Sequence, residues 1–235
     1  SRRFLYQATG KKIEPLVHPL ASMAEMDQWS QKYIGQYFNS TEGRKLLIRA
    51  TFQQAKEDGV TVLEIGEDVW GLKEFFHNDI DELVESFTSA QREIAPEIEL
   101  RLQIGLSRHC PISYLEDCLS YFWGNKNFYS IDLYGDEFAQ PIENFKGIYR
   151  RAKKEGLRLK AHVGEWGTAK DIRTAVEELE LDEVQHGIAA AGDESVIRFL
   201  AENKIRLNIT PTSNVLLGRV ADMAEHPIGK LYRSG

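Results

Sequence analysis

The chain has 235 residues, of which 42% are hydrophobic and 28% charged, and its formal net charge is −7 at pH 7. This composition is that of a globular protein, and the length suits one α/β domain. The negative charge argues against a nucleic-acid partner. The sequence contains no run of about 18 apolar residues, the length needed to span a membrane. Cys110 and Cys118 are too few for a disulfide framework, which predicts reduced thiols and a cytoplasmic location.

From Thr51 onward, helical and strand-like segments alternate along the chain. The predicted strands are Val60–Ile65, Glu99–Gly105, Phe128–Leu133, Leu157–His162, Glu183–His186 and Ile205–Thr210. The predicted helices are Thr41–Asp58, Asp79–Ile94, Ser113–Phe122, Pro141–Glu155, Thr168–Glu180 and Asp193–Asn203. Glycines after two of these helices, Gly59 and Gly156, are typical of helix C-terminal caps, and Thr168 and Asp193 are typical N-caps. Short strands joined by helices require a parallel sheet, and six such units in a row favour a barrel over an open sheet.

Residues 1–40 do not follow this alternation. The segment Met23–Phe38 has apolar residues at helical spacing, so we predict a helical or irregular region there. No linker or low-complexity run interrupts the chain, and we therefore predict that residues 1–235 form a single domain.

Residues capable of acid–base or metal chemistry follow three successive predicted strands. His162 ends one strand and Glu165 comes three residues later, His186 ends the next strand, and Thr210–Asn214 follows the last. In parallel α/β proteins the carboxyl ends of the strands carry the active site, and an imidazole beside a carboxylate there suits metal-assisted acid–base catalysis. The alternative is that a strand-end histidine is a structural, hydrogen-bonded residue.

Four short motifs resemble those of the adenosine deaminase family of the amidohydrolase superfamily. The chain has HVGE at 162–165, QHG at 185–187, TPTSN at 210–214 and DLYGDE at 132–137, where the family has HAGE, GHG, CPTSN and DLAGDE. They occur in the family's order and with similar spacing, and the resemblance extends from about Thr51 to Arg233. It implies an α/β fold, the TIM (β/α)8 barrel of metallo-dependent hydrolases, with residues 1–40 as a helical or irregular segment over the barrel mouth.

The resemblance also implies roles for four residues. His162 would be a zinc ligand, and Glu165 would protonate the purine ring nitrogen next to the carbon under attack. His186 would stand beside the zinc-bound water as base and electrostatic stabiliser, and the backbone of Gly135 would contact the purine. Without the resemblance, Glu165 reads as an acid in the first turn of a helix and Gly135 as a turn after a strand.

Two parts of the family pattern are missing from the sequence. There is no H-x-H, which would provide two zinc ligands, and no Asp-Asp pair, which would provide a third ligand and a catalytic carboxylate. We therefore expect about six of the eight βα units, without the first and last barrel strands, and open sheet edges at Val60–Ile65 and Ile205–Thr210. We further expect that these residues alone hold no well-occupied catalytic zinc and do not catalyse deamination.

The resulting prediction is a zinc-dependent enzyme that hydrolytically deaminates a purine nucleoside or base, of the adenosine-to-inosine type. Its partner would be a small purine, with no nucleic acid and no membrane; the oligomeric state is left open. Two alternatives are a related amidohydrolase acting on another amino heterocycle, and a catalytically inactive relative that serves as a binding or scaffold protein.

Overall fold

The computed structural model describes residues 2–16, 18–37 and 39–235 and divides into two compact units. The first comprises Ser1–Leu16, Ala24–Ile104 and Asp117–Phe128, and the second comprises Val17–Met23, Gly105–Glu116 and Tyr129–Gly235. That residues 1–235 form one domain, with residues 1–40 over a barrel mouth, stays a prediction.

The first unit begins with helices, as the apolar spacing indicates. Its elements are α1 (Arg2–Thr9), α2 (Met23–Tyr33), the 3-10 helix η1 (Gly35–Tyr37), α3 (Thr41–Glu57), β1 (Val62–Asp68), α4 (Val69–Phe76), α5 (Ile80–Ile94) and most of β2 (Glu99–Ser107). The predicted helix Met23–Phe38 therefore stops at Tyr33, and Phe38 lies outside the described residues. α3 packs against α5 and α1, and the side chains of Ser40 and Asp79 cap the first turns of α3 and α5.

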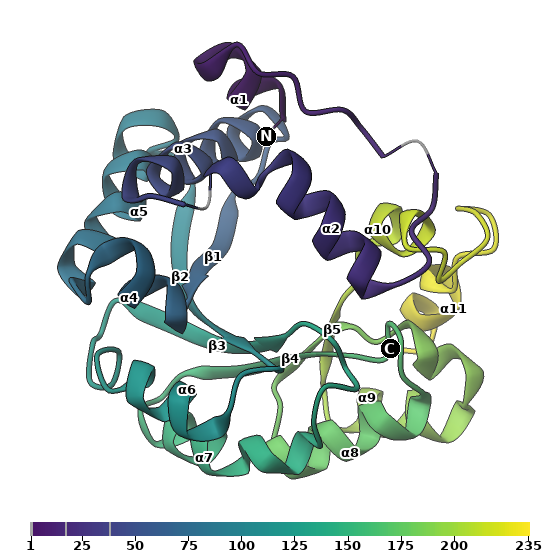
Figure 1. Ribbon diagram of the computed structural model, residues 1–235. Helices are drawn as coiled ribbons and strands as arrows, with labels where there is room; N and C mark the ends of the chain where they lie inside the picture. Colours follow the sequence, from purple (N-terminus) through teal and green to yellow (C-terminus); the bar gives the residue numbers. More distant parts are fainter. Residues whose placement is uncertain (1, 17, 38) are drawn as a thin grey trace. The chain divides into compact units, whose positions relative to one another are not determined.

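The second unit carries four parallel strands and the helices that connect them (Figure 1). Its elements are α6 (Ile112–Leu119), β3 (Phe128–Tyr134), η2 (Ile142–Phe145), α7 (Lys146–Lys154), β4 (Arg158–Val163), α8 (Ala169–Leu179), β5 (Glu183–His186), η3 (Ile188–Gly192), α9 (Glu194–Glu202), β6 (Arg206–Asn208), α10 (Pro211–Leu216) and α11 (Ile228–Arg233). Thr168 and Asp171 form a capping box at the start of α8, which confirms the predicted N-cap.

In the described part of the chain the sheet has six strands, in the order β1-β2-β3-β4-β5-β6. The predicted number and order of strands are confirmed, with ends shifted by up to three residues. The largest differences are at β1, which starts two residues later than predicted and ends three residues later, at Asp68, and at β6, which stops at Asn208 because Pro211 already starts helix α10. α4, α10 and α11 were not predicted, because six to eight residues are too few for a clear helical period.

The strands of the second unit have one apolar and one polar face. On β4, Leu159, Ala161 and Val163 are buried on the side against which α7 and α8 pack, whereas Lys160 and His162 point the other way. The polar face continues on the neighbouring strands, in register with β4, through Asp132 on β3 and through Glu183 and Gln185 on β5. Two groups of polar residues arise there: a charge cluster around Glu183, and the candidate site around His162.

The charge cluster is deeply buried. The Glu183 carboxylate lies 3.2 Å from the Lys160 ammonium and accepts a 2.9 Å hydrogen bond from Asn208, and the side chains of Glu183 and Lys160 are only 3% and 4% exposed. Burial opposes the charged form of Glu183, but the Asn208 hydrogen bond and the Lys160 charge outweigh it and lower the pKa.

Glu183→Gln is expected to lower the free energy of unfolding by about 3 kcal/mol at pH 7, because it removes the carboxylate that pairs with the buried Lys160 ammonium. Urea denaturation measures the loss. The matched control is Glu180→Gln, which removes an exposed ion pair with Lys153 and should cost much less than Glu183→Gln. Since the pKa of Glu183 is lowered in the folded protein, the difference should persist above the unfolded-state pKa and shrink as the pH falls through the folded-state value. Equal losses in the two variants would contradict this account of the cluster.

None of the helices in the described residues is both long and apolar enough to cross a bilayer.

Candidate active site

The carboxyl ends of β3, β4 and β5 bring the predicted site histidines together. His162 pairs in register with Gln185, and both side chains bind one carboxylate on β3: His162 Nδ1 lies 3.2 Å from Asp132 Oδ1, and Gln185 Nε2 donates to Asp132 Oδ2 over 3.2 Å. A buried carboxylate accepts hydrogen bonds, so Nδ1 of His162 carries a proton and Nε2 is the nitrogen available to a ligand. Asp132 therefore sets the tautomer and the aim of His162.

His186 reaches the same place through an unusual backbone conformation. It pairs in register with Val163, and strand alternation alone would turn it to the apolar face with Val184. Its backbone φ of 66° instead lies in the left-handed region, which residues other than glycine rarely adopt. The imidazole centres of His186 and His162 are 5.2 Å apart, and Nδ1 of His186 lies 3.2 Å from Glu165 Oε1.

Asn214 joins His186 to Glu165. Asn214 is completely buried. Its Nδ2 donates to Glu165 Oε1 over 2.7 Å and lies 3.2 Å from Nδ1 of His186. The hydroxyl of Thr210 lies 3.0 Å from Nδ1 of His186. The Thr-Pro-Thr-Ser-Asn segment after β6 thus carries two groups that face the candidate catalytic pair.

The orientation of Asn214 is set by His226. The backbone N–H of Ile228 donates to Nδ1 of His226, so Nε2 carries the proton and donates to Asn214 Oδ1 over 3.1 Å. This directs the Asn214 amide N–H groups toward Glu165 and His186. The hydrogen-bonded chain from His226 through Asn214 to Glu165 joins residues far apart in sequence, so no local sequence signal predicts it.

The electrostatic environment separates the three ionisable groups of the site. Burial raises the pKa of Glu165, although the Asn214 hydrogen bond and the charge of His162 oppose the shift. Burial lowers the pKa of His186 to about 4, with a further contribution from the charge of His162. Burial also disfavours the charged form of His162, but the Asp132 carboxylate outweighs it and raises the pKa. At neutral pH His186 is therefore a neutral imidazole with proton-accepting capacity, and Glu165 holds its proton more tightly than an exposed glutamate does.

Gly135, the predicted purine contact, turns the chain after β3. Its φ is 99°, and a Cβ there would lie 3.7 Å from Nδ1 of His109, an ordinary contact distance. The glycine is therefore explained by the left-handed turn and not by crowding. Its contact with a purine stays a prediction.

A cavity of about 440 Å³ opens beside Glu165. Glu165, Trp166, Ile188, Arg219 and Pro227 are among its lining residues, and the Arg219 guanidinium lies 4.4 Å from the centre of the Trp166 ring. The volume is in the range of small-molecule pockets, and the wall combines an aromatic ring, a cation and the candidate acid. Glu165 is the one predicted site residue that reaches this space.

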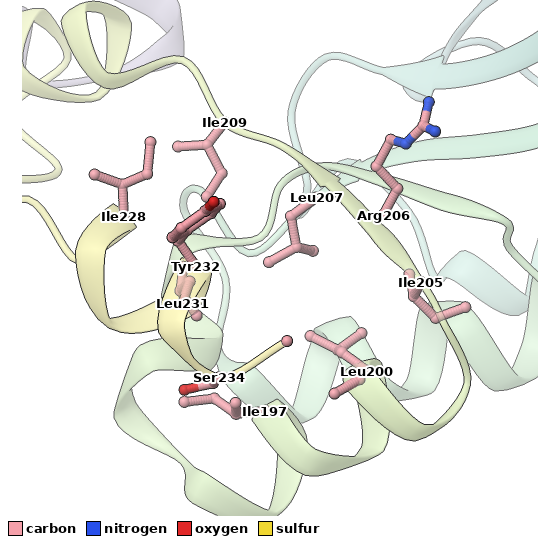
Figure 2. A pocket seen from close by; sticks show the side chains of 12 residues that line it. Ile197, Leu200, Ile205, Arg206, Leu207, Ile209, Ile228, Leu231, Tyr232 and Ser234 are labelled. Carbon is pink, nitrogen blue, oxygen red and sulfur yellow. The ribbon is translucent and has the colours of Figure 1, made fainter.

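A larger apolar groove of about 650 Å³ lies elsewhere in the unit and contains none of the predicted site residues (Figure 2). Figure 2 shows Leu200 of α9, Leu207 of β6 and Leu231 of α11 around it. Its wall offers little acid–base chemistry, so it is not the candidate site.

The donor set fits zinc only in part. His162 has the arrangement of a metal ligand, with its second ring nitrogen bound to a carboxylate. However, within 2–16, 18–37 and 39–235 no three histidine, cysteine or acidic side chains converge as a metal site would require. Zinc sites use at least three protein ligands, so the described residues account for one of them.

These features, a parallel α/β sheet with two histidines and a glutamate at its strand ends, define a hydrolase-type site on a barrel-forming fold. The family model for adenosine deaminase matches residues 7–235. The chain therefore belongs to the adenosine deaminase family, as the four motifs predict.

One relative agrees with this assignment, and two solved structures show the same fold. The Treponema pallidum protein named adenosine/adenine deaminase is 34% identical over 97% of this chain and 76% of its own length. The crystal structure of adenine deaminase from Arthrobacter aurescens has a TM-score of 0.78 at 21% identity, covering 98% of this chain and 73% of that one. A Burkholderia ambifaria amidohydrolase structure with bound Zn has a TM-score of 0.71 at 21% identity, covering 84% and 56%. The predicted α/β barrel fold is thus confirmed, and the chain corresponds to part of each of these proteins.

Proposed function

We propose that the protein catalyses the hydrolytic deamination of a purine base or nucleoside. The observation that carries this proposal is the contact between Glu165, whose pKa is raised, and His186, whose pKa is lowered to about 4, at adjoining strand ends. Two groups whose pKa values are driven in opposite directions are suited to act as acid and base at the same pH. Membership of a family of deaminase enzymes points to an amino-substituted ring as the substrate.

In the proposed reaction, Glu165 donates its proton to the ring nitrogen next to the amino-bearing carbon, which makes that carbon electrophilic. Neutral His186 accepts a proton from the attacking water. A C–O bond forms, and His186 passes the water proton to the amino group, so that the C–N bond breaks and ammonia leaves. The new hydroxyl group gives its proton to the Glu165 carboxylate, which leaves the keto-purine and regenerates the acid. Asn214 contacts both the acid and the base and so fixes their positions relative to each other.

For the metal, we propose His162 Nε2 as one zinc ligand, oriented by Asp132. Zinc held there would act as a Lewis acid that makes water nucleophilic near neutral pH. Gly135 is proposed to contact the purine through its backbone. A cytoplasmic location, with no nucleic-acid or membrane partner, completes the proposal and rests on the net charge of −7 and on the low number of cysteines, which is two.

The proposal is tested with protein expressed from its complete gene. Purified protein is incubated with adenine and adenosine in parallel, and the release of ammonia and the formation of hypoxanthine or inosine are measured together. We expect stoichiometric ammonia and keto-purine from one of the two compounds. Turnover of another amino heterocycle alone would favour the related-amidohydrolase alternative. Binding of purines without turnover at any metal load would favour the inactive relative.

A further inference from the structure

The loop that carries Glu165 is wrapped around a second carboxylate. Glu137 accepts hydrogen bonds from four consecutive backbone N–H groups: from Gly164 over 2.7 Å, Glu165 over 2.9 Å, Trp166 over 2.8 Å and Gly167 over 3.2 Å. The Glu137 side chain is buried, and each of its two carboxylate oxygens accepts two of the four hydrogen bonds. Successive N–H groups that converge on one anion form a nest, which fixes the loop as firmly as regular secondary structure would.

The amino acids of the loop fit this arrangement. Gly164 has a φ of 75°, and a Cβ there would lie 2.4 Å from Ile172 Cδ1. A Cβ on Gly167 would lie 2.8 Å from Glu137 Oε2, that is, against the bound carboxylate itself. Glycine is thus favoured at both positions that flank Glu165 and Trp166: at Gly164 by the backbone conformation, and at Gly167 by the proximity of Glu137.

A buried cation accompanies the carboxylate. Arg108 is only 7% exposed and lines a cavity of about 170 Å³ together with Glu137. Burial lowers the pKa of Arg108, and the charge of Glu137 is the largest effect that opposes this. Arg108 therefore adds a positive charge near the carboxylate that accepts the four hydrogen bonds.

Glu165 therefore has two independent supports. Asn214 holds its side chain, and Glu137 holds its backbone and that of its neighbours. No other carboxylate in the described residues binds the 164–167 backbone in this way. Since the loop follows β4 directly and precedes α8, releasing it would move the carboxyl group of Glu165 with respect to His186.

We propose that Glu137 is a positioning residue for the general acid, acting through the backbone of 164–167 and not on the substrate itself. This inference rests on the proposed function for its effect on catalysis, and its structural part can be tested separately.

The test is Glu137→Gln in protein expressed from its complete gene. Glutamine has nearly the same shape, but one end of its amide is itself an N–H donor and would face two of the N–H groups of the loop. We expect kcat to fall about 10- to 100-fold and KM to change less than about 3-fold, because a small displacement of a catalytic group lowers the rate of the chemical step. Hydrogen exchange should accelerate at the amides of 164–167 and not in α8.

Two further variants make the test specific. Asp136→Asn removes the neighbouring charge but keeps the oxygen that accepts from the Phe138 N–H, and should leave kcat and the exchange rates unchanged. Glu137→Asp keeps the charge on a shorter side chain and should give an intermediate kcat. If Glu137→Gln does not fold, Glu137→Asp carries the test.

Several outcomes would overturn the proposal. Unchanged exchange at 164–167 in Glu137→Gln would show that the carboxylate does not hold the loop. Faster exchange and a lower Tm with full kcat would make Glu137 a purely structural residue. If the unaltered protein deaminates neither purine, the proposed function fails, but local exchange at 164–167 still decides whether Glu137 positions the backbone of Glu165.

Discussion

Glu165→Gln is expected to reduce turnover by roughly 10² to 10⁴ in the protein expressed from its complete gene, while the fold and the metal content stay unchanged. Glutamine retains the oxygen that accepts the Asn214 hydrogen bond, so the local structure should survive. What it lacks is the proton that we propose to be transferred to the ring nitrogen. Deaminase assays, circular dichroism and metal analysis of the same sample measure the three quantities.

The matched control is Glu177→Gln, which removes an exposed carboxylate on α8 that pairs with Arg173 and does not reach the site. It should keep full turnover. The pH profile provides a second criterion: because Glu165 acts in its protonated form, turnover should decline as the pH rises through its raised pKa. If Glu165→Gln turns over as fast as the unaltered protein, Glu165 has no part in proton transfer.

His162→Ala and His186→Ala are expected to fail in different ways. His162→Ala should lower the zinc content, because it removes a donor that Asp132 holds in a ligand orientation, and the rate should fall with it. His186→Ala should retain the zinc and lose about 10² to 10⁴ in rate, because His186 contacts Glu165, Asn214 and Thr210 and is the base in the proposed reaction. Metal analysis after dialysis against zinc-free buffer distinguishes the two variants.

His109→Ala serves as the control for removing a strand-end imidazole, since no catalytic or metal role is assigned to it. It should keep the zinc. Adding zinc back to His162→Ala should restore only part of the zinc content, because the site lacks one of its ligands. Equal zinc loss in His162→Ala and His186→Ala would contradict the division of roles between the two histidines.

The sequence by itself determined the family, the strand order and the identity of the candidate acid and base. Local patterns carry this information: alternation on β4 places Lys160 and His162 on one face, and capping residues such as Thr168 mark where α8 begins. The motifs HVGE and QHG stand at strand ends because a parallel sheet aligns its carboxyl ends, so His162 and His186 could be predicted as neighbours before any coordinates existed.

Only the tertiary structure decided how these groups are held. Alternation places His186 on the wrong face, and its left-handed φ, which no local motif encodes, turns it toward Glu165. Asp132, Asn214, His226 and Glu137 reach the site from segments 12 to 49 residues away from the groups they bind. Hydrogen bonds between distant segments depend on how the helices pack on the sheet, and that packing is a property of the whole unit and not of any short stretch of sequence.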